Sequence, residues 1–160
     1  MIPVAFLLIF NSLWFWQQYL IVRPVVNERA WQIGTKEMIL TANNLAPNYS
    51  KVWISRSGWG WIHLVFHTRY DPIVLQNEIK ASGRNEFGFW WVSDIGKYHL
   101  EWLPQKLGFT NKTLYIGTPV EFKEPVVPIY KIKDKSGKEI FWFIDETSIK
   151  TGVSSEEVYL

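Results

Sequence analysis

The feature that most constrains this chain is a nearly continuous apolar segment over residues 2–22. Polar side chains interrupt it only at Asn11, Ser12, Gln17 and Gln18. At about 1.5 Å per residue, a helix of this length reaches roughly 31 Å, which matches the hydrocarbon core of a bilayer. Pro24 then sets the natural end of the helix. We therefore expect residues 1–23 to form a membrane-directed hydrophobic helix.

The second half of this segment carries residues that favour a membrane interface. Trp14, Trp16 and Tyr19 are amphipathic aromatics, and Arg23 follows them as a cation that can extend to the headgroups. The part before Trp14 is about a dozen residues, roughly 18 Å, which is short for a full crossing. The expected anchor residues are Phe6, Leu7, Leu8, Ile9, Phe10, Trp14, Trp16, Tyr19 and Arg23.

A retained single span, acting as a signal anchor, is the favoured interpretation of this segment, and others stay open. A cleaved signal peptide is disfavoured because no Lys or Arg precedes Arg23 and no small-residue cleavage triplet follows. A helix in the interface plane, or one docked on protein, is compatible with Asn11 and Gln18, which lie seven residues apart and can share a polar stripe. We expect a cell-membrane location, single-pass or peripheral, with the side that carries the domain unresolved.

Composition limits what residues 24–160 can be. The chain has 160 residues, 48% hydrophobic and 20% charged, so the remainder fits one small folded domain. The chain has 17 basic and 15 acidic residues, and its basic residues form no long run. Both observations argue against nucleic acid as a partner. The absence of cysteine excludes disulfides, thiolate metal sites and cysteine nucleophiles.

Hydrophobic patterning predicts an α+β domain, a mostly antiparallel sheet with one or two packed helices. Alternation is clearest from Trp61 to Tyr70, which predicts a central strand. Asp71 as N-cap and Pro72 at the first position predict a helix over residues 72–82. Residues 31–41 fit a strand or a short helix. Residues 94–104 lack periodicity and predict loop and short helix.

The expected shorter strands lie nearer the carboxyl end. Residues 51–55, 113–117 and 120–123 are strand candidates, and residues 124–128 form an extended link. Residues 129–134 and 139–145 predict a hairpin whose loop uses Gly137 for a positive φ. Residues 158–160 could add an edge pairing.

Candidate chemistry is sparse. In a strand, His63 and His67 would lie about 13 Å apart, too far to share a metal ion. His99, with His63 or His67 and Glu101, is the alternative set for a small hydrolase or a metal-dependent enzyme. No serine elbow, phosphate loop or other catalytic motif occurs, so we assign no catalytic residue, metal or cofactor.

Aromatic content exceeds the background, with ten Trp, seven Tyr and ten Phe. Exposed aromatics provide large contact areas at little entropic cost and mark protein, glycan or membrane surfaces. In residues 87–91 we expect Trp90 to be displayed while the opposite parity is buried. The expected binding residues are Trp59, Trp61, Trp90, Trp91, His63, His67, Tyr98 and Trp102.

These patterns together favour a membrane-anchored, non-enzymatic binding or assembly module over an enzyme. The expected partners are the membrane and another envelope protein, with any small-molecule ligand unknown. A glycan-binding domain with a tryptophan platform is a further alternative. An exposed planar row of Trp beside polar groups would favour glycan binding, whereas a flat apolar patch would favour a protein partner.

Overall fold

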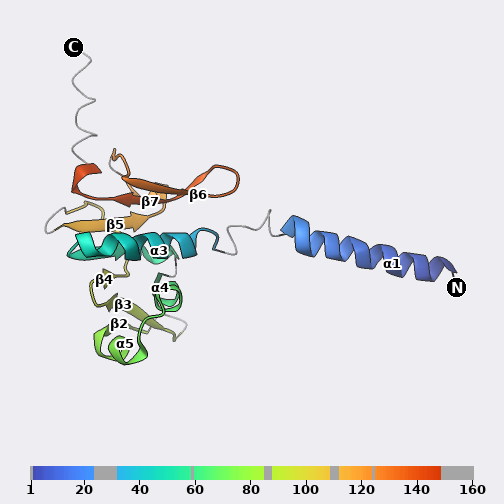
Figure 1. Cartoon of the computed structure of the whole chain (residues 1–160), viewed down its shortest axis with the longest axis horizontal. Coiled ribbons are helices and arrows are strands. Elements are labelled where there is room, and N and C mark those ends of the chain that lie inside the picture. Colours follow the sequence, from blue (N-terminus) through green and yellow to red (C-terminus); the bar gives the residue numbers. More distant parts are fainter. Residues whose placement is uncertain are drawn as a thin grey trace, which may run out of the picture. The chain divides into compact units, whose positions relative to one another are not determined.

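The computed structural model describes residues 2–23, 32–58, 60–84, 88–108, 112–123 and 125–148. The chain divides into two compact units, Met1–Ile33 and Gly34–Leu160. Figure 1 labels the α-helices and, apart from β1, the strands.

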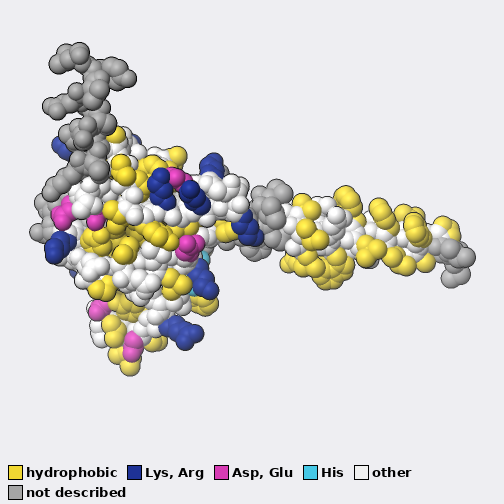
Figure 2. All heavy atoms as spheres, turned by 45° about the horizontal axis from the view of Figure 1, so that its top comes forward, with side chains coloured by type: hydrophobic (Ala, Val, Ile, Leu, Met, Phe, Trp, Pro, Cys, Tyr) yellow, Lys and Arg dark blue, Asp and Glu magenta, His cyan; other side chains and the backbone are white. Residues whose placement is uncertain are grey.

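The first unit is one apolar helix, as the sequence predicts. It comprises α1, Ile2–Gln17, and a wider π-helical end, η1, Gln18–Val22. Residues Pro3–Val22 have a mean hydropathy of 1.3, and none of their side chains is buried. Figure 2 shows hydrophobic side chains along the visible face of this helix. By length and composition, the helix can cross a membrane.

The second unit is built on a mixed sheet. In the described residues its seven strands follow the order β2-β3-β4-β1-β5-β7-β6. β1 runs parallel to β4 and β5, and the other neighbours are antiparallel. The bounds are β1 Lys51–Ile54, β2 Ile79–Arg84, β3 Trp90–Ile95, β4 Tyr98–His99, β5 Thr113–Gly117, β6 Tyr130–Lys133 and β7 Glu139–Ile144. The predicted α+β class with a mostly antiparallel sheet is confirmed.

In the described part of the second unit, three α-helices accompany the sheet: α3, Thr35–Leu45; α4, Gly60–Thr68; and α5, Pro72–Glu78. Short 3-10 turns occur at η2, Ala46–Asn48; η3, Arg56–Gly58; and η4, Pro119–Glu121. α3 resolves the ambiguity of residues 31–41 as a helix, which begins after Gly34 with a φ of +79°.

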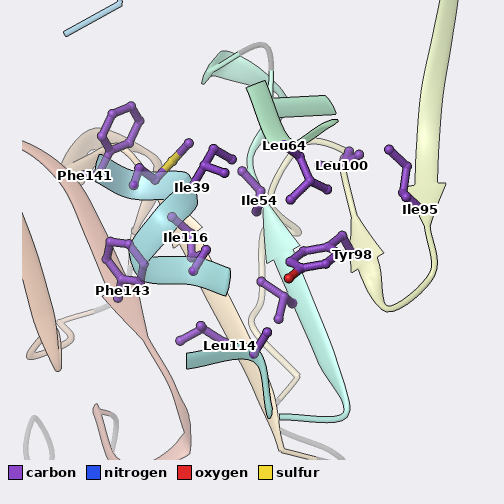
Figure 3. Close-up of a cluster of buried hydrophobic side chains, with 14 of the residues drawn as sticks. Ile39, Ile54, Leu64, Ile95, Tyr98, Leu100, Leu114, Ile116, Phe141 and Phe143 are labelled. Atoms are coloured by element: carbon purple, nitrogen blue, oxygen red, sulfur yellow. The ribbon is translucent and has the colours of Figure 1, made fainter. Parts of the chain in front are cut away.

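The core lies between one face of the sheet and helices α3 and α4. α3 contributes Met38, Ile39 and Ala42, and α4 contributes Leu64, all fully buried. Figure 3 shows Ile39 and Leu64 among side chains from the central strands. The strand residues of this cluster include Val52, Ile54, Ile95, Tyr98, Leu114, Ile116, Ile132, Phe141 and Phe143.

The predicted central strand over residues 61–70 is wrong, because residues 61–68 belong to α4 and the last two follow it. A strand would place Ile62, Leu64 and Phe66 on one face. Instead Leu64 is buried while Ile62 and Phe66 are exposed. Apolar residues also recur at helical spacing here, since Leu64 and Val65 follow Trp61 by three and four positions, so the period is ambiguous from sequence alone. Topology decides it: β1 and β4 are parallel neighbours, and parallel strands need a long crossover connection, usually helical.

The start of α5 is confirmed and its end is wrong. Asp71 Oδ1 accepts hydrogen bonds from the backbone nitrogens of Ile73 at 2.7 Å and Val74 at 3.4 Å, which is the predicted N-cap. The helix ends at Glu78 rather than residue 82, because Ile79 is already extended and pairs with Ile95 of β3. Pairing with a neighbouring strand outweighs weak helical propensity here.

Of the remaining predicted segments, some are confirmed and others are wrong. The strands at residues 51–55 and 113–117 and the hairpin of β6 and β7, with Gly137 at a φ of +85°, are confirmed. The loop and short helix predicted over residues 94–104 are wrong at their start, where β3 ends and β4 follows. Residues 120–123 begin in η4 instead of a strand. The predicted edge pairing at residues 158–160 lies outside the described residues.

Candidate functional site

The sheet face opposite to α3 and α4 carries the largest group of interacting polar and aromatic side chains that we find in the described residues. Strand residues alternate between faces, so the neighbours of buried Val52, Ile54 and Tyr98 project away from the core. We name this group the Trp53 cluster. Its members are Lys51, Trp53, Arg56, Trp91, Asp94, His99, Glu101 and Tyr115.

An aspartate–histidine pair lies within this cluster. Asp94 of β3 and His99 of β4 are register partners, and Asp94 Oδ1 lies 2.6 Å from His99 Nδ1. Burial disfavours the charged form of the Asp94 carboxyl and would raise its pKa. Hydrogen bonds from His99 and Ser93, together with the charges of His99 and Lys51, outweigh the effect of burial and hold the pKa of Asp94 below its ordinary value. When the imidazole is neutral, donation from Nδ1 to Asp94 directs Nε2 to act as an acceptor.

The Trp53 ring packs against one side of the His99 imidazole. It lies edge-on to His99, with 4.1 Å between ring centroids, and 5.8 Å from the ring of Tyr115. The Lys51 ammonium lies 4.6 Å from the Trp53 ring centroid. The Trp53 indole N–H donates to the Glu101 backbone carbonyl at 3.0 Å, which fixes the ring against the sheet.

Arg56 connects the cluster to a second tryptophan. Its guanidinium carbon lies 3.9 Å from the centroid of the Trp91 ring, and its Nη1 lies 3.7 Å from Glu101 Oε2. The Trp91 indole N–H donates to the Leu100 carbonyl at 3.0 Å. Both indole rings are therefore anchored to the backbone that follows β4, so this face presents a preorganised arrangement of aromatic, cationic and anionic groups.

A second polar group lies where β1 and β5 end. Glu121 accepts hydrogen bonds from Ser55 Oγ, from Ser57 Oγ at 3.1 Å, and from the backbone and hydroxyl of Thr118 at 2.8 Å each. These bonds form a capping box on η4 and join the ends of two parallel strands. The Glu121 carboxylate accepts four hydrogen bonds, so its role is to hold these chain segments together. Among the described residues, these hydroxyls donate to Glu121 and His99 pairs with Asp94, so no serine–histidine–aspartate triad is assembled there.

The two histidines of α4 are closer than the strand interpretation requires. His63 and His67 lie one helical turn apart, with 5.6 Å between stacked ring centroids rather than about 13 Å. Partial burial lowers the pKa of His63, and the neighbouring His67 lowers it further. In the described part of the chain, no group of three or more His, Asp and Glu side chains could hold a metal ion.

His99 does not join this helical pair. Its neighbours Tyr98 and Leu100 point into the core, and Leu100 lies beside the start of α4 at Gly60. His99 consequently projects from the opposite face of the sheet, away from α4. The set of His99 with His63 or His67 is thus divided by the sheet.

The expected aromatic residues fall in several places. Trp91 is buried in the Trp53 cluster, whereas Trp90 and Trp102 are exposed by 58% and 59%. The Arg84 guanidinium lies 5.2 Å from the Trp90 ring centroid. Tyr98 is buried in the core and donates its hydroxyl to Asn43 at 2.9 Å.

The alternation of buried and exposed side chains expected around Trp90 holds only in part. The display of Trp90 beside buried Trp91 is confirmed, but Phe89 is also exposed. Trp61 lies half-buried on α4. Trp59 lies outside the described residues.

Sequence reasoning missed the Asp94–His99 pair and the Arg56 stack. A signal for the pair is present: Gly96 and Lys97 form a tight turn, with a φ of +55° at Gly96, between two short extended runs. Recognising that turn would place Asp94 opposite His99. The stack of Arg56 on Trp91 joins positions 35 residues apart and has no local signal.

No family model matches the chain, and comparisons with curated proteins and with solved structures find no match. The functional inference therefore rests on the geometry of the chain itself.

Proposed function

We propose that this chain is a membrane-anchored, non-enzymatic binding module whose aromatic surface contacts another envelope protein. The observation that carries the proposal is the helix Pro3–Val22, which is long and apolar enough to cross a membrane. Exposing this much apolar surface to water is costly, so a bilayer is its natural solvent.

Details of the helix support a membrane environment. Asn11, close to the centre of the helix, donates from Nδ2 to the Leu7 carbonyl at 2.9 Å, which satisfies part of its hydrogen-bonding capacity within the helix. Phe15 and Tyr19 stack with 5.8 Å between centroids near the end that leads to Arg23. This aromatic-then-basic order suits the boundary between acyl chains and headgroups.

Exposed aromatics on the domain support the binding part of the proposal. Phe89, Trp90 and Trp102 are each more than half exposed, although large aromatics are usually buried in a soluble domain. Trp90 is paired with Arg84, and tryptophan and arginine are both enriched at the energetic centres of protein interfaces.

Fractionation of cells that produce the tagged chain tests the anchor. We expect the unchanged chain to sediment with membranes, and Leu8→Arg with Leu13→Arg to release it, because each central arginine costs about 3 kcal/mol in a bilayer. Val120→Arg with Val127→Arg adds the same charge at exposed positions of the domain and should leave the chain in the membrane fraction. Recovery of the unchanged chain in the soluble fraction would overturn the proposal.

Photocrosslinking tests the aromatic surface. Benzoylphenylalanine at Trp90 or Trp102 should give a discrete cross-linked protein in intact cells, whereas the same group at exposed Val127 should not. Equal products at all three positions, or none at Trp90 and Trp102, would contradict an aromatic binding surface.

A further inference from the structure

The outer face of α4 and the first turn of α5 expose apolar side chains on both sides of the turn that contains Arg69. We name this group the α4–α5 patch, and its members are Ile62, Phe66, Arg69, Ile73 and Val74. Phe66 and Ile73 are each 73% exposed, and Ile62 and Val74 are also exposed.

The helical geometry explains why these side chains lie outside. Leu64 is buried and Val65 packs against the core, so Ile62 and Phe66, one turn apart, point away from the sheet. Three residues join α4 to α5. Within them Arg69 takes a φ of +52° and donates its N–H to the Phe66 carbonyl at 3.4 Å, which reverses the chain directly after Phe66.

The covalent tether limits what this patch can meet. Eight residues, 24–31, join the anchor helix to Gln32. Even fully extended they reach about 30 Å, which is less than the diameter of a domain of this size. If the helix is anchored as proposed above, the domain stays within about 30 Å of the membrane surface, and headgroups are present at high effective concentration.

The chemistry of the patch matches a headgroup layer. Phenylalanine and aliphatic side chains partition into the boundary between headgroups and acyl chains, and arginine interacts with lipid phosphates. Arg69 is exposed among the apolar residues. The neighbouring carboxylate of Asp71 accepts backbone hydrogen bonds at the start of α5.

From this combination we propose that the α4–α5 patch docks on the anionic headgroup layer of the membrane that holds the helix, and so orients the domain. The proposal rests on the proposed anchor. Docking would hold the domain in one orientation relative to the bilayer, instead of leaving it to rotate about its tether.

Lipid quenching of single labels tests the docking. The chain contains no cysteine, so Phe66→Cys, Ile73→Cys and the control Val120→Cys each carry one environment-sensitive fluorophore without further changes. Val120 is 87% exposed and lies on η4, after β5, outside the α4–α5 patch. The full chain is reconstituted into nanodiscs of phosphatidylcholine and phosphatidylglycerol that contain lipids with a quencher near the headgroup.

We expect quenching at positions 66 and 73 to exceed that at position 120 by at least about twofold, as an interfacial location requires. Arg69→Glu should reduce the quenching at position 66, and so should discs of phosphatidylcholine alone. Equal quenching at all three positions in lipid-bound chain would overturn the docking while leaving the anchor intact. A label at position 66 with a blue-shifted emission but no lipid quenching would show that the patch contacts a protein or a second copy of the chain, which would overturn docking on lipid. A chain that does not enter the discs would overturn the anchor itself, and the docking with it.

Discussion

Asp71 is the residue whose local role is best defined by its contacts. Its carboxylate accepts two backbone hydrogen bonds from the first turn of α5, so its removal leaves those donors without their cap. Asp71→Ala should therefore lower the free energy of unfolding by about 1 kcal/mol, whereas Asp71→Asn, which also caps well, should change it by only a few tenths. Denaturant unfolding of the full chain in detergent measures both. Equal losses for the two variants would contradict the capping role.

His63 gives the domain a pH dependence with a defined sign. Partial burial and the neighbouring His67 lower the pKa of His63 below its ordinary value of 6.5 in the folded state. Between these two values the unfolded chain binds more protons, so stability rises with pH across that window and falls as pH decreases through it. Unfolding midpoints should show this slope just below pH 6.5, and His63→Gln should reduce it.

The carboxylates produce a separate effect. The pKa values of Asp94 and Asp145 lie below their ordinary value of 3.8, so the stability that they contribute is present above that pH and is lost only in stronger acid. A slope near pH 6 that persists unchanged in the His63→Gln variant would show that His63 is not its source.

At the scale of elements, α4 offers a direct comparison between a helix and a strand. Leu64 and Phe66 are two residues apart and would share a face in a strand, but in the helix one is buried and the other is exposed. Leu64→Ala should cost about 2–5 kcal/mol of unfolding free energy. Phe66→Ala should change it by no more than about 0.5 kcal/mol in detergent. Comparable losses at both positions would support the strand.

Two hairpin turns differ in how much room their glycines have. Gly96 joins β3 to β4 with a φ of +55°, and an added Cβ would lie 2.6 Å from Glu78 Oε2 and 3.3 Å from the Tyr70 hydroxyl. Gly137 has a φ of +85° and open space around it. Gly137→Ala should cost about 1–2 kcal/mol from backbone strain alone. Gly96→Ala should cost clearly more, because it also disturbs the bond between Tyr70 and Glu78. Thermal unfolding of the pair checks the order.

These same elements show what local sequence can predict. Where a strong local signal exists, as with Asp71-Pro72 or the hairpin loop at Gly137, the element and its start follow from sequence. α4 has apolar residues at both strand and helix spacing, so its type depends on the parallel pairing of β1 with β4, which is a property of the whole sheet. β2 follows α5 without a stop signal because β3 provides its pairing partner.

At the scale of the whole molecule, the class and the apolar helix follow from composition and patterning, whereas the Trp53 cluster does not. Trp53, Arg56, Asp94 and His99 come from different strands and loops, and only strand order and register bring them together. Aromatic content indicates that some surface is used for binding. It does not indicate which tryptophans are exposed, since Trp90 and Trp91 are adjacent and differ completely.

The central claim is that the helix Pro3–Val22 holds this domain at a membrane as an integral anchor. Alkaline carbonate extraction of membranes containing the unchanged full-length chain tests it most directly, because carbonate strips proteins bound only at the surface. We predict that the chain stays in the pellet and is released only by detergent. Release of most of the chain into the carbonate supernatant would contradict an integral anchor.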